Sequence, residues 1–157
     1  MDKSKLKTYG LFILFTEIVG VVAGLFTSMG MDAYDAVEKP ALTPPDIVFP
    51  IVWTILYALM GISAARIWLS PPTKVRNHGL IIWGVQLFFN FFWSLIFFNL
   101  QSYGIAFIWI LILWALIIGM IYIFNKTDRL AALLQIPYLI WVTFAAYLNF
   151  MVWMLNR

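Results

Sequence analysis

Long apolar runs, separated by short segments rich in proline and charge, dominate this sequence. Five of the runs approach or reach the roughly 20 residues that an α-helix needs to cross the hydrocarbon core of a membrane. We expect these spans at about residues 9–28, 49–69, 80–98, 103–124 and 131–155. Nothing between them resembles a soluble domain. Residues 1–157 are therefore predicted to form a single all-α membrane domain, a bundle of five transmembrane helices.

The first run carries an acidic residue near its middle. Glu17 is followed by Gly20, Gly24 and Thr27 at helical spacing on much the same face. A carboxyl group at that depth is costly and is therefore a candidate functional group. The alternative is a structural role, with the carboxyl protonated or hydrogen-bonded inside the bundle. The glycines suit close packing within one chain or a dimer contact.

Residues 30–47 form a long extramembrane connector between the first and second predicted helices. Asp32, with Asp35 three positions later, is typical of a helix N-terminus and predicts a short helix there. The prolines within residues 40–45 then favour extended backbone. A stiff, partly apolar segment at the membrane face suits a lid over a site, and a plain interfacial anchor is the alternative.

Polar side chains follow one face of the third run. Gln86, Asn90 and Ser94 recur at every fourth position, which places them on one side of a helix. In hydrocarbon, side-chain amides must face protein or a cavity, so this face is predicted to point into the bundle.

In the fifth run, Pro137 predicts a kink or a delayed start of the regular helix.

The composition is wrong for a soluble globular protein and excludes several kinds of site. The chain is 64% apolar and 11% charged, with a mean hydropathy of +0.93. It has no cysteine, which excludes disulfides, thiolate metal sites and cysteine nucleophiles, and its one histidine, His78, cannot build the usual metal cluster. No metal site is expected. The net charge of +3 comes without a basic stripe, so no nucleic-acid partner is expected either.

The basic residues are distributed unevenly between the two sides of a five-span topology. One side holds eight of the ten, namely Lys3, Lys5, Lys7, Arg66, Lys74, Arg76, Lys126 and Arg129. The other side holds Lys39 and Arg157. Because basic residues accumulate on the cytoplasmic side, we expect an integral membrane protein with its N-terminus in the cytoplasm and its connector and C-terminus outside.

Three stretches resemble one known family. Phe49-Pro-Ile-Val-Trp-Thr-Ile-Leu-Tyr-Ala-Leu-Met-Gly61 resembles the signature of the TspO/MBR family, the tryptophan-rich sensory and translocator proteins also known as peripheral benzodiazepine receptors. Gln86-x-x-x-Asn90-x-x-Trp93-Ser94 is similar to the family's third helix, and Pro137-Tyr-Leu-Ile-Trp-Val-Thr-Phe-Ala-Ala-Tyr-Leu-Asn149 to its fifth. Leu42 departs from the pattern, since many members have Trp there, so one aromatic wall is expected to be missing.

The resemblance implies a bacterial cell-membrane protein, usually a homodimer, with a pocket beneath the connector. It implies binding of tetrapyrroles such as protoporphyrin IX and of isoquinoline carboxamide drugs, and of cholesterol in animal members. Carried over by motif position, the pocket comprises Tyr34, Pro44, Phe49, Trp53, Tyr57, Asn90, Trp93, Trp141, Ala145 and Leu148. It also implies light-dependent porphyrin breakdown, which some bacterial members promote, with the tetrapyrrole as ligand and no required cofactor.

The residues themselves favour such a ligand. A porphyrin is a wide, flat π-system that needs aromatic walls at ring distances of ~4.5–7 Å and a few orienting polar groups. Trp53 and Tyr57 share a helix face one turn apart, Trp141 lies near small residues, and Asn90 supplies a donor. His78 is predicted on the opposite side from this pocket, so a metal-free porphyrin or a loosely held haem fits better than axial ligation.

Sterol binding receives little support from the sequence. The proposed cholesterol pattern needs a basic residue within about six positions after its tyrosine. The next basic residue after Tyr147 is Arg157, so the strict pattern fails.

Two classes of function stay open. The first is a membrane receptor, sensor or carrier that binds a small molecule. The second is an enzyme-like photo-oxidation of bound protoporphyrin IX, with Trp53 and Trp141 as the candidate oxidisable indoles. No acid–base or nucleophile constellation supports conventional catalysis, so any reaction would draw on ligand, light and oxygen. A transporter with Glu17 along its path is a third interpretation, disfavoured because no inverted repeat is visible.

Overall fold

The computed structural model describes residues 1–157, and its regular elements are all helical. They are α1 (Lys3–Asp35), α2 (Val48–Trp68), α3 (Lys74–Ser94), the π-helical η1 (Leu95–Asn99), α4 (Tyr103–Thr127), α5 (Arg129–Leu133) and α6 (Ile136–Leu155). Five segments are long and apolar enough to cross a membrane, where α3 continues into η1 and α5 into α6. The predicted all-α class with five membrane-spanning helices is confirmed.

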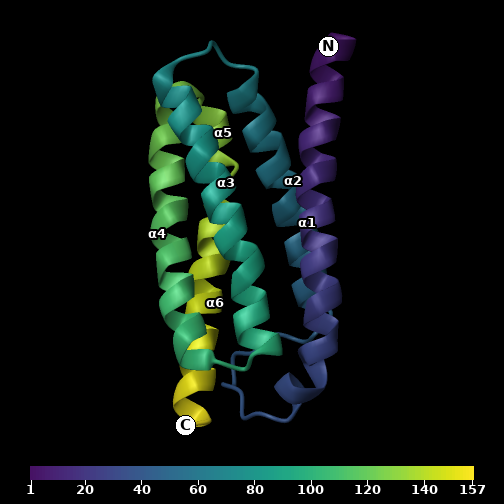
Figure 1. The fold of residues 1–157 in the computed structure, drawn as a ribbon, viewed down its shortest axis with the longest axis vertical. Helices are drawn as coiled ribbons and strands as arrows, with labels where there is room; N and C mark the ends of the chain where they lie inside the picture. The colour runs from purple at the N-terminus through teal and green to yellow at the C-terminus, as the bar shows by residue number, and fades with distance from the viewer.

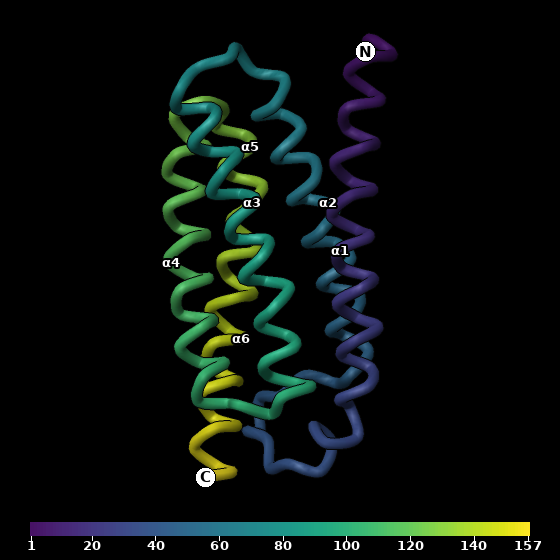
Figure 2. Tube along the Cα trace, viewed as in Figure 1, coloured from purple at the N-terminus to yellow at the C-terminus, as the bar shows by residue number.

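The helices run side by side along the long axis of the molecule (Figure 1). α1 lies at the edge of the bundle and packs mainly on α2, whereas α4 packs on α3 and α6. The N- and C-termini lie at opposite ends, and the segment between α1 and α2 crosses the end that also holds the C-terminus (Figure 2). The exposed apolar side chains of these helices are the surface that a lipid bilayer covers.

Polar caps mark where two of the helices begin. Thr73 caps α3 by accepting a hydrogen bond from the backbone N–H of Arg76 at 3.1 Å. Asp128 caps α5 by accepting from the backbone N–H of Leu130 at 2.9 Å. The same Asp128 carboxylate pairs with the Arg66 guanidinium at 2.8 Å, which joins the end of α2 to the turn between α4 and α5.

α1 is longer than the sequence pattern predicts. It continues to Asp35, so the connector comprises residues 36–47 rather than 30–47, and the predicted long connector is wrong in extent. Gly30, the first residue of the predicted connector, lies inside α1, where an added Cβ would collide with the carbonyl oxygen of Phe98. The glycine is needed because α1 and η1 approach each other closely, not because the helix stops there.

No separate helix begins at Asp32, which is a second correction. Asp32 lies in the last turns of α1, and Tyr34, two residues later, packs against η1. The Tyr34 ring is 5.8 Å from the ring of Phe97 and 5.1 Å from that of Phe98. This packing keeps residues 32–35 in α1, although their sequence pattern is typical of a helix start.

The connector is attached to the C-terminal end of the chain. Glu38 donates its backbone N–H to the side-chain oxygen of Asn156 at 2.9 Å. The Asn156 side-chain amide donates in return to the Glu38 carbonyl at 2.8 Å.

Pro137 was expected to kink the fifth span or to delay its regular helix. The span is broken there: α5 ends at Leu133, and α6 begins with this proline in its first turn.

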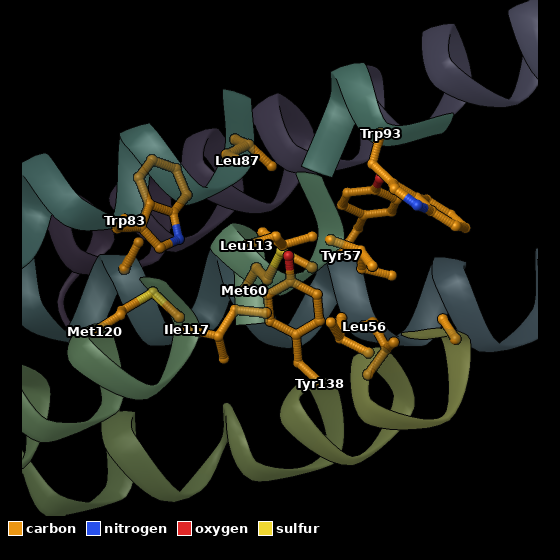
Figure 3. Packing of buried hydrophobic residues seen from close by; sticks show 14 of the residues in the cluster. Leu56, Tyr57, Met60, Trp83, Leu87, Trp93, Leu113, Ile117, Met120 and Tyr138 are labelled. Carbon is orange, nitrogen blue, oxygen red and sulfur yellow. The ribbon is translucent and has the colours of Figure 1, made fainter. Parts of the chain in front are cut away.

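The core lies between α2, α3, α4 and α6. The buried side chains of α4 recur every three or four residues at Ala106, Ile110, Leu113, Ile117, Met120 and Phe124. Figure 3 shows Tyr138 rising from α6 into the middle of this core, with Leu56 and Met60 of α2 beside it. Tyr138 and Met60 are completely buried, so large and flexible side chains fill the centre of the bundle.

We expect Asn156→Ala to release the connector. The substitution removes both hydrogen bonds to Glu38, each worth about 1 kcal/mol, so the Glu38 amide should exchange its hydrogen roughly ten-fold faster. Hydrogen–deuterium exchange of the protein in detergent measures this rate. Arg157→Ala, at the neighbouring residue, is the control. Equal exchange at Glu38 in both variants would show that Asn156 does not hold the connector.

Candidate functional site

A cavity of about 460 Å³ lies between α1, α2, α3 and α6 at the end of the bundle that the connector crosses. Aromatic side chains from these helices and from η1 form much of its wall: Tyr34, Phe49, Trp53, Tyr57, Trp93, Phe98 and Trp141. Val21, Gly24 and Thr54 line it and are also exposed, so the cavity opens between α1 and α2. Its volume and apolar lining are typical of a small-molecule site.

Most residues of the predicted pocket meet in this one cavity. Those that line it are Tyr34, Phe49, Trp53, Tyr57, Asn90, Trp93, Trp141 and Ala145. Pro44 and Leu148 do not line it. Leu148 is only 7% exposed and packs within the bundle, whereas Pro44 belongs to the connector.

Two indoles meet edge to face at one wall. The ring centroids of Trp53 and Trp141 lie 6.4 Å apart with their planes at 88°. Phe49 extends this wall at 5.8 Å from Trp141, and Tyr57 extends it at 5.6 Å from Trp53. The indole N–H of Trp141 is buried without a hydrogen-bond partner. The wall therefore offers a planar ligand both aromatic faces and edges.

A chain of hydrogen bonds leads from the cavity into the core. The Tyr57 hydroxyl donates to Asn90 Oδ1 at 2.6 Å, Asn90 Nδ2 donates to the Tyr138 hydroxyl at 2.8 Å, and that hydroxyl donates to Gln86 Oε1 at 2.7 Å. Gln86 and Asn90 are buried, as expected of the polar face of the third span. One of the two amide N–H groups of Asn90 is therefore already engaged, which limits what it can offer a ligand.

Trp93 presents its ring rather than its N–H to the cavity. Its indole N–H donates to Asn149 Oδ1 at 3.0 Å, and Asn149 Nδ2 donates to the Tyr103 carbonyl at 2.8 Å. The ring of Trp93 stacks on Phe97 at 5.3 Å. These contacts join α3, η1, α4 and α6 behind the cavity and fix the orientation of one wall.

The two glycines of α1 have different environments. A Cβ at Gly20 would lie 2.5 Å from the Tyr57 ring, so this glycine allows α1 to pack on α2 within the chain. Gly24 has no atom within 4 Å of such a Cβ and lines the cavity. Residue spacing had placed both with Glu17 and Thr27 on one face, and Glu17 and Thr27 also line the cavity.

Other residues near the site could not be placed from the sequence pattern. Asp46 and Phe98 line the cavity, although no spacing pattern singled them out. Leu42 is 66% exposed and does not line the cavity. His78 is exposed and lies in the first turns of α3, at the end of the bundle away from the connector.

The family model described as TspO/MBR matches residues 12–154 of this chain. The chain belongs to the TspO/MBR family. Among curated relatives of this TspO/MBR protein, "Tryptophan-rich protein TspO" of Chlorobaculum tepidum is 37% identical over 95% of this chain and 96% of its own length. "Protein CrtK" of Rhodobacter capsulatus is 35% identical over 96% and 94%. "Translocator protein" of Ovis aries is 31% identical over 82% and 77%.

Family membership and the five apolar spans together make this TspO/MBR protein an integral membrane protein. The curated relatives match nearly the whole chain, so the likeness includes the helices that surround the cavity. The predicted family is confirmed.

We expect Tyr138→Phe to destabilise the protein, although Tyr138 itself does not line the cavity. The change leaves Asn90 Nδ2 and Gln86 Oε1 without their partner in a buried site, which should cost about 2–4 kcal/mol of unfolding free energy. Unfolding in mixed SDS micelles measures it. Tyr122→Phe is the matched control, because Tyr122 is 64% exposed. Equal stability of the two variants would contradict a structural role for the hydrogen-bond chain.

Proposed function

We propose that this TspO/MBR protein is a membrane receptor that binds planar tetrapyrroles such as protoporphyrin IX in the cavity between α1, α2, α3 and α6. The observation that carries the proposal is the cavity of about 460 Å³ with aromatic walls. A tetrapyrrole offers the large, flat π-surface that such walls stabilise by offset and edge-to-face contacts. Isoquinoline carboxamides, which are also flat and largely apolar, fit the same reasoning.

The cavity wall suits a metal-free porphyrin better than a ligated haem. Its lining contains no histidine, cysteine or methionine except Met31 on α1. The single histidine, His78, is exposed at the other end of the bundle. Axial ligation would have to rely on Met31 or on a tyrosine of the lining, and the Tyr57 hydroxyl already donates to Asn90. We therefore expect a porphyrin to be held mainly by stacking.

Light-dependent degradation of the bound porphyrin is a second candidate function, favoured by the two indoles at one wall. Trp53 and Trp141 lie 6.4 Å apart and both line the cavity, so either would contact a ligand stacked there. An excited porphyrin is an oxidant, and an indole in contact with it can supply an electron, after which molecular oxygen can react with the ligand. Reactivity would come from light, ligand and oxygen.

Assembly and orientation extend the proposal. We place the protein in a bacterial cell membrane as a homodimer, with the lysine-rich start of α1 in the cytoplasm and the connector outside, because basic residues accumulate on the inner side. A porphyrin transporter or sensor would use the same cavity without degrading the ligand. Uptake of porphyrin into sealed liposomes that depends on Glu17 would favour transport.

Gly24→Leu should block the cavity. Gly24 lines the cavity where it opens between α1 and α2, and no atom lies within 4 Å of its potential Cβ, so a leucine there should fit and obstruct the opening. Affinity for protoporphyrin IX, followed by quenching of tryptophan fluorescence, should fall roughly ten-fold or more. Gly10→Leu on the exposed part of α1 is the control and should bind as the wild type. Unchanged binding by Gly24→Leu would place the ligand elsewhere.

Trp53→Phe combined with Trp141→Phe should slow photobleaching more than it weakens binding. Phenylalanine keeps an aromatic wall but is much harder to oxidise than indole. Illumination of the protein with bound protoporphyrin IX, followed through the Soret band, measures the rate, with Trp114→Phe as a control outside the cavity. If the double variant binds normally and bleaches at the wild-type rate, the indole mechanism is wrong. If the wild-type protein binds protoporphyrin IX but does not bleach it, only the receptor function is supported.

A further inference from the structure

The charged groups of the cavity are all acidic. Glu17 on α1 and Asp46 in the connector line it, and the lining contains no lysine, arginine or histidine. The two acids differ in environment: Asp46 is exposed in the connector, whereas Glu17 is partly buried within the first membrane span. Water and salt screen the charge of Asp46 far more effectively than that of Glu17.

Glu17 has no partner in the protein. Its carboxyl group makes neither a hydrogen bond nor an ion pair, and the ion pair of the structure joins Arg66 to Asp128. The hydroxyl groups of Ser28, Thr54 and Ser94, which also line the cavity, instead donate to carbonyls of their own helices. Glu17 is therefore a strong acceptor that the fold leaves available.

The position of Glu17 is fixed by its neighbours. Thr16 is completely buried and donates its hydroxyl to the Tyr57 carbonyl at 2.7 Å. One turn later on α1, the Tyr57 ring packs against Gly20. These contacts set the rotation of α1 against α2, so Glu17 is turned toward the cavity by packing rather than by a partner of its own.

An unpaired carboxyl group at membrane depth is costly, and a ligand that supplies a donor removes much of that cost. In either protonation state a carboxyl keeps an acceptor oxygen, so an N–H donor is favoured in both cases. A ligand carboxylate placed beside Glu17 would instead add a second acidic group where little water screens the charge.

A lysine, Lys39, lies beside the connector end of the cavity without lining it, and Asp46 lines the cavity at that end. Lys39 Nζ lies 4.6 Å from the ring centroid of Tyr34, and that ring lines the cavity near the connector. Glu17 and Tyr34 are separated by about 25 Å along α1 at 1.5 Å per residue. The cavity therefore has an acceptor at its deep end. Its connector end has both the Asp46 carboxylate and the Lys39 ammonium group, whose Nζ already donates to the carbonyls of Asp35 at 3.3 Å and Val37 at 3.5 Å.

We propose that Glu17 is a specificity-determining residue, which selects planar aromatic ligands presenting an N–H donor or a protonated nitrogen toward α1 and directs carboxylate substituents toward Lys39. The inference rests on the proposed tetrapyrrole-binding function and names the polarity of the ligand that this cavity prefers. A neutral or cationic tetrapyrrole is bound more tightly than the dicarboxylate with the same macrocycle.

Three ligands with one macrocycle test this preference: protoporphyrin IX, its dimethyl ester, and its bis-amide with terminal ammonium groups. Quenching of tryptophan fluorescence gives the affinity of each ligand for the protein of residues 1–157 in detergent. In the wild type, the ammonium derivative should bind more tightly than the diacid. In Glu17→Gln, which keeps the shape of the side chain, this ratio should fall roughly ten-fold, the size of a lost charge-assisted hydrogen bond.

Two further variants test whether the preference depends on Glu17 itself or on any charged group near the cavity. Asp46→Asn removes the exposed acid and should leave the order of affinities nearly unchanged. Lys39→Gln should weaken binding of the diacid and leave the ester unaffected. If Glu17→Gln keeps the wild-type ratio, or if Asp46→Asn lowers it equally, the role of Glu17 is wrong while the proposed binding function stands. Absence of saturable binding of all three ligands would overturn both.

Discussion

Tyr57 holds the helices on three sides of the cavity in one arrangement. Its backbone carbonyl accepts from Thr16 of α1, its ring fills the space beside Gly20, and its hydroxyl donates to Asn90 of α3 at 2.6 Å. Within hydrocarbon no water competes for these groups, so an unmade hydrogen bond has no external substitute. The relation of α1, α2 and α3, and hence the space between them, depends on this residue.

The same requirement divides the side chains around the cavity into two kinds of surface. Polar edges turn toward protein partners: Trp93 donates to Asn149, and Asn90 lies between two tyrosine hydroxyls. Aromatic faces are left for the cavity. Recognition here therefore depends mainly on shape and π-surface. Glu17 and the indole N–H of Trp141 are exceptions, because both belong to residues that line the cavity and neither has a hydrogen-bond partner in the protein.

The spans and the inward polar face could be predicted because both follow from local rules. Long apolar runs require helices in a membrane, and Gln86 and Asn90 at helical spacing must avoid lipid. The connector could not be bounded in the same way. Glycine often ends a helix, yet Gly30 lies inside α1 at the point where this helix contacts the carbonyl of Phe98. A local pattern does not distinguish a glycine at a helix end from one at a close contact.

The sequence by itself determined the class of the protein, because long apolar runs are local features. Its motifs also determined the family, and the resemblance to that family indicated most of the aromatic residues around the cavity. The tertiary structure alone decided which face of α4 is buried, since that helix is apolar all round, and that Asp46 joins Glu17 in one cavity. It also decided that Leu42 and Leu148 lie outside the cavity. These outcomes depend on the rotation of each helix against its neighbours, which contacts such as Gly20 with Tyr57 set and which no single segment encodes.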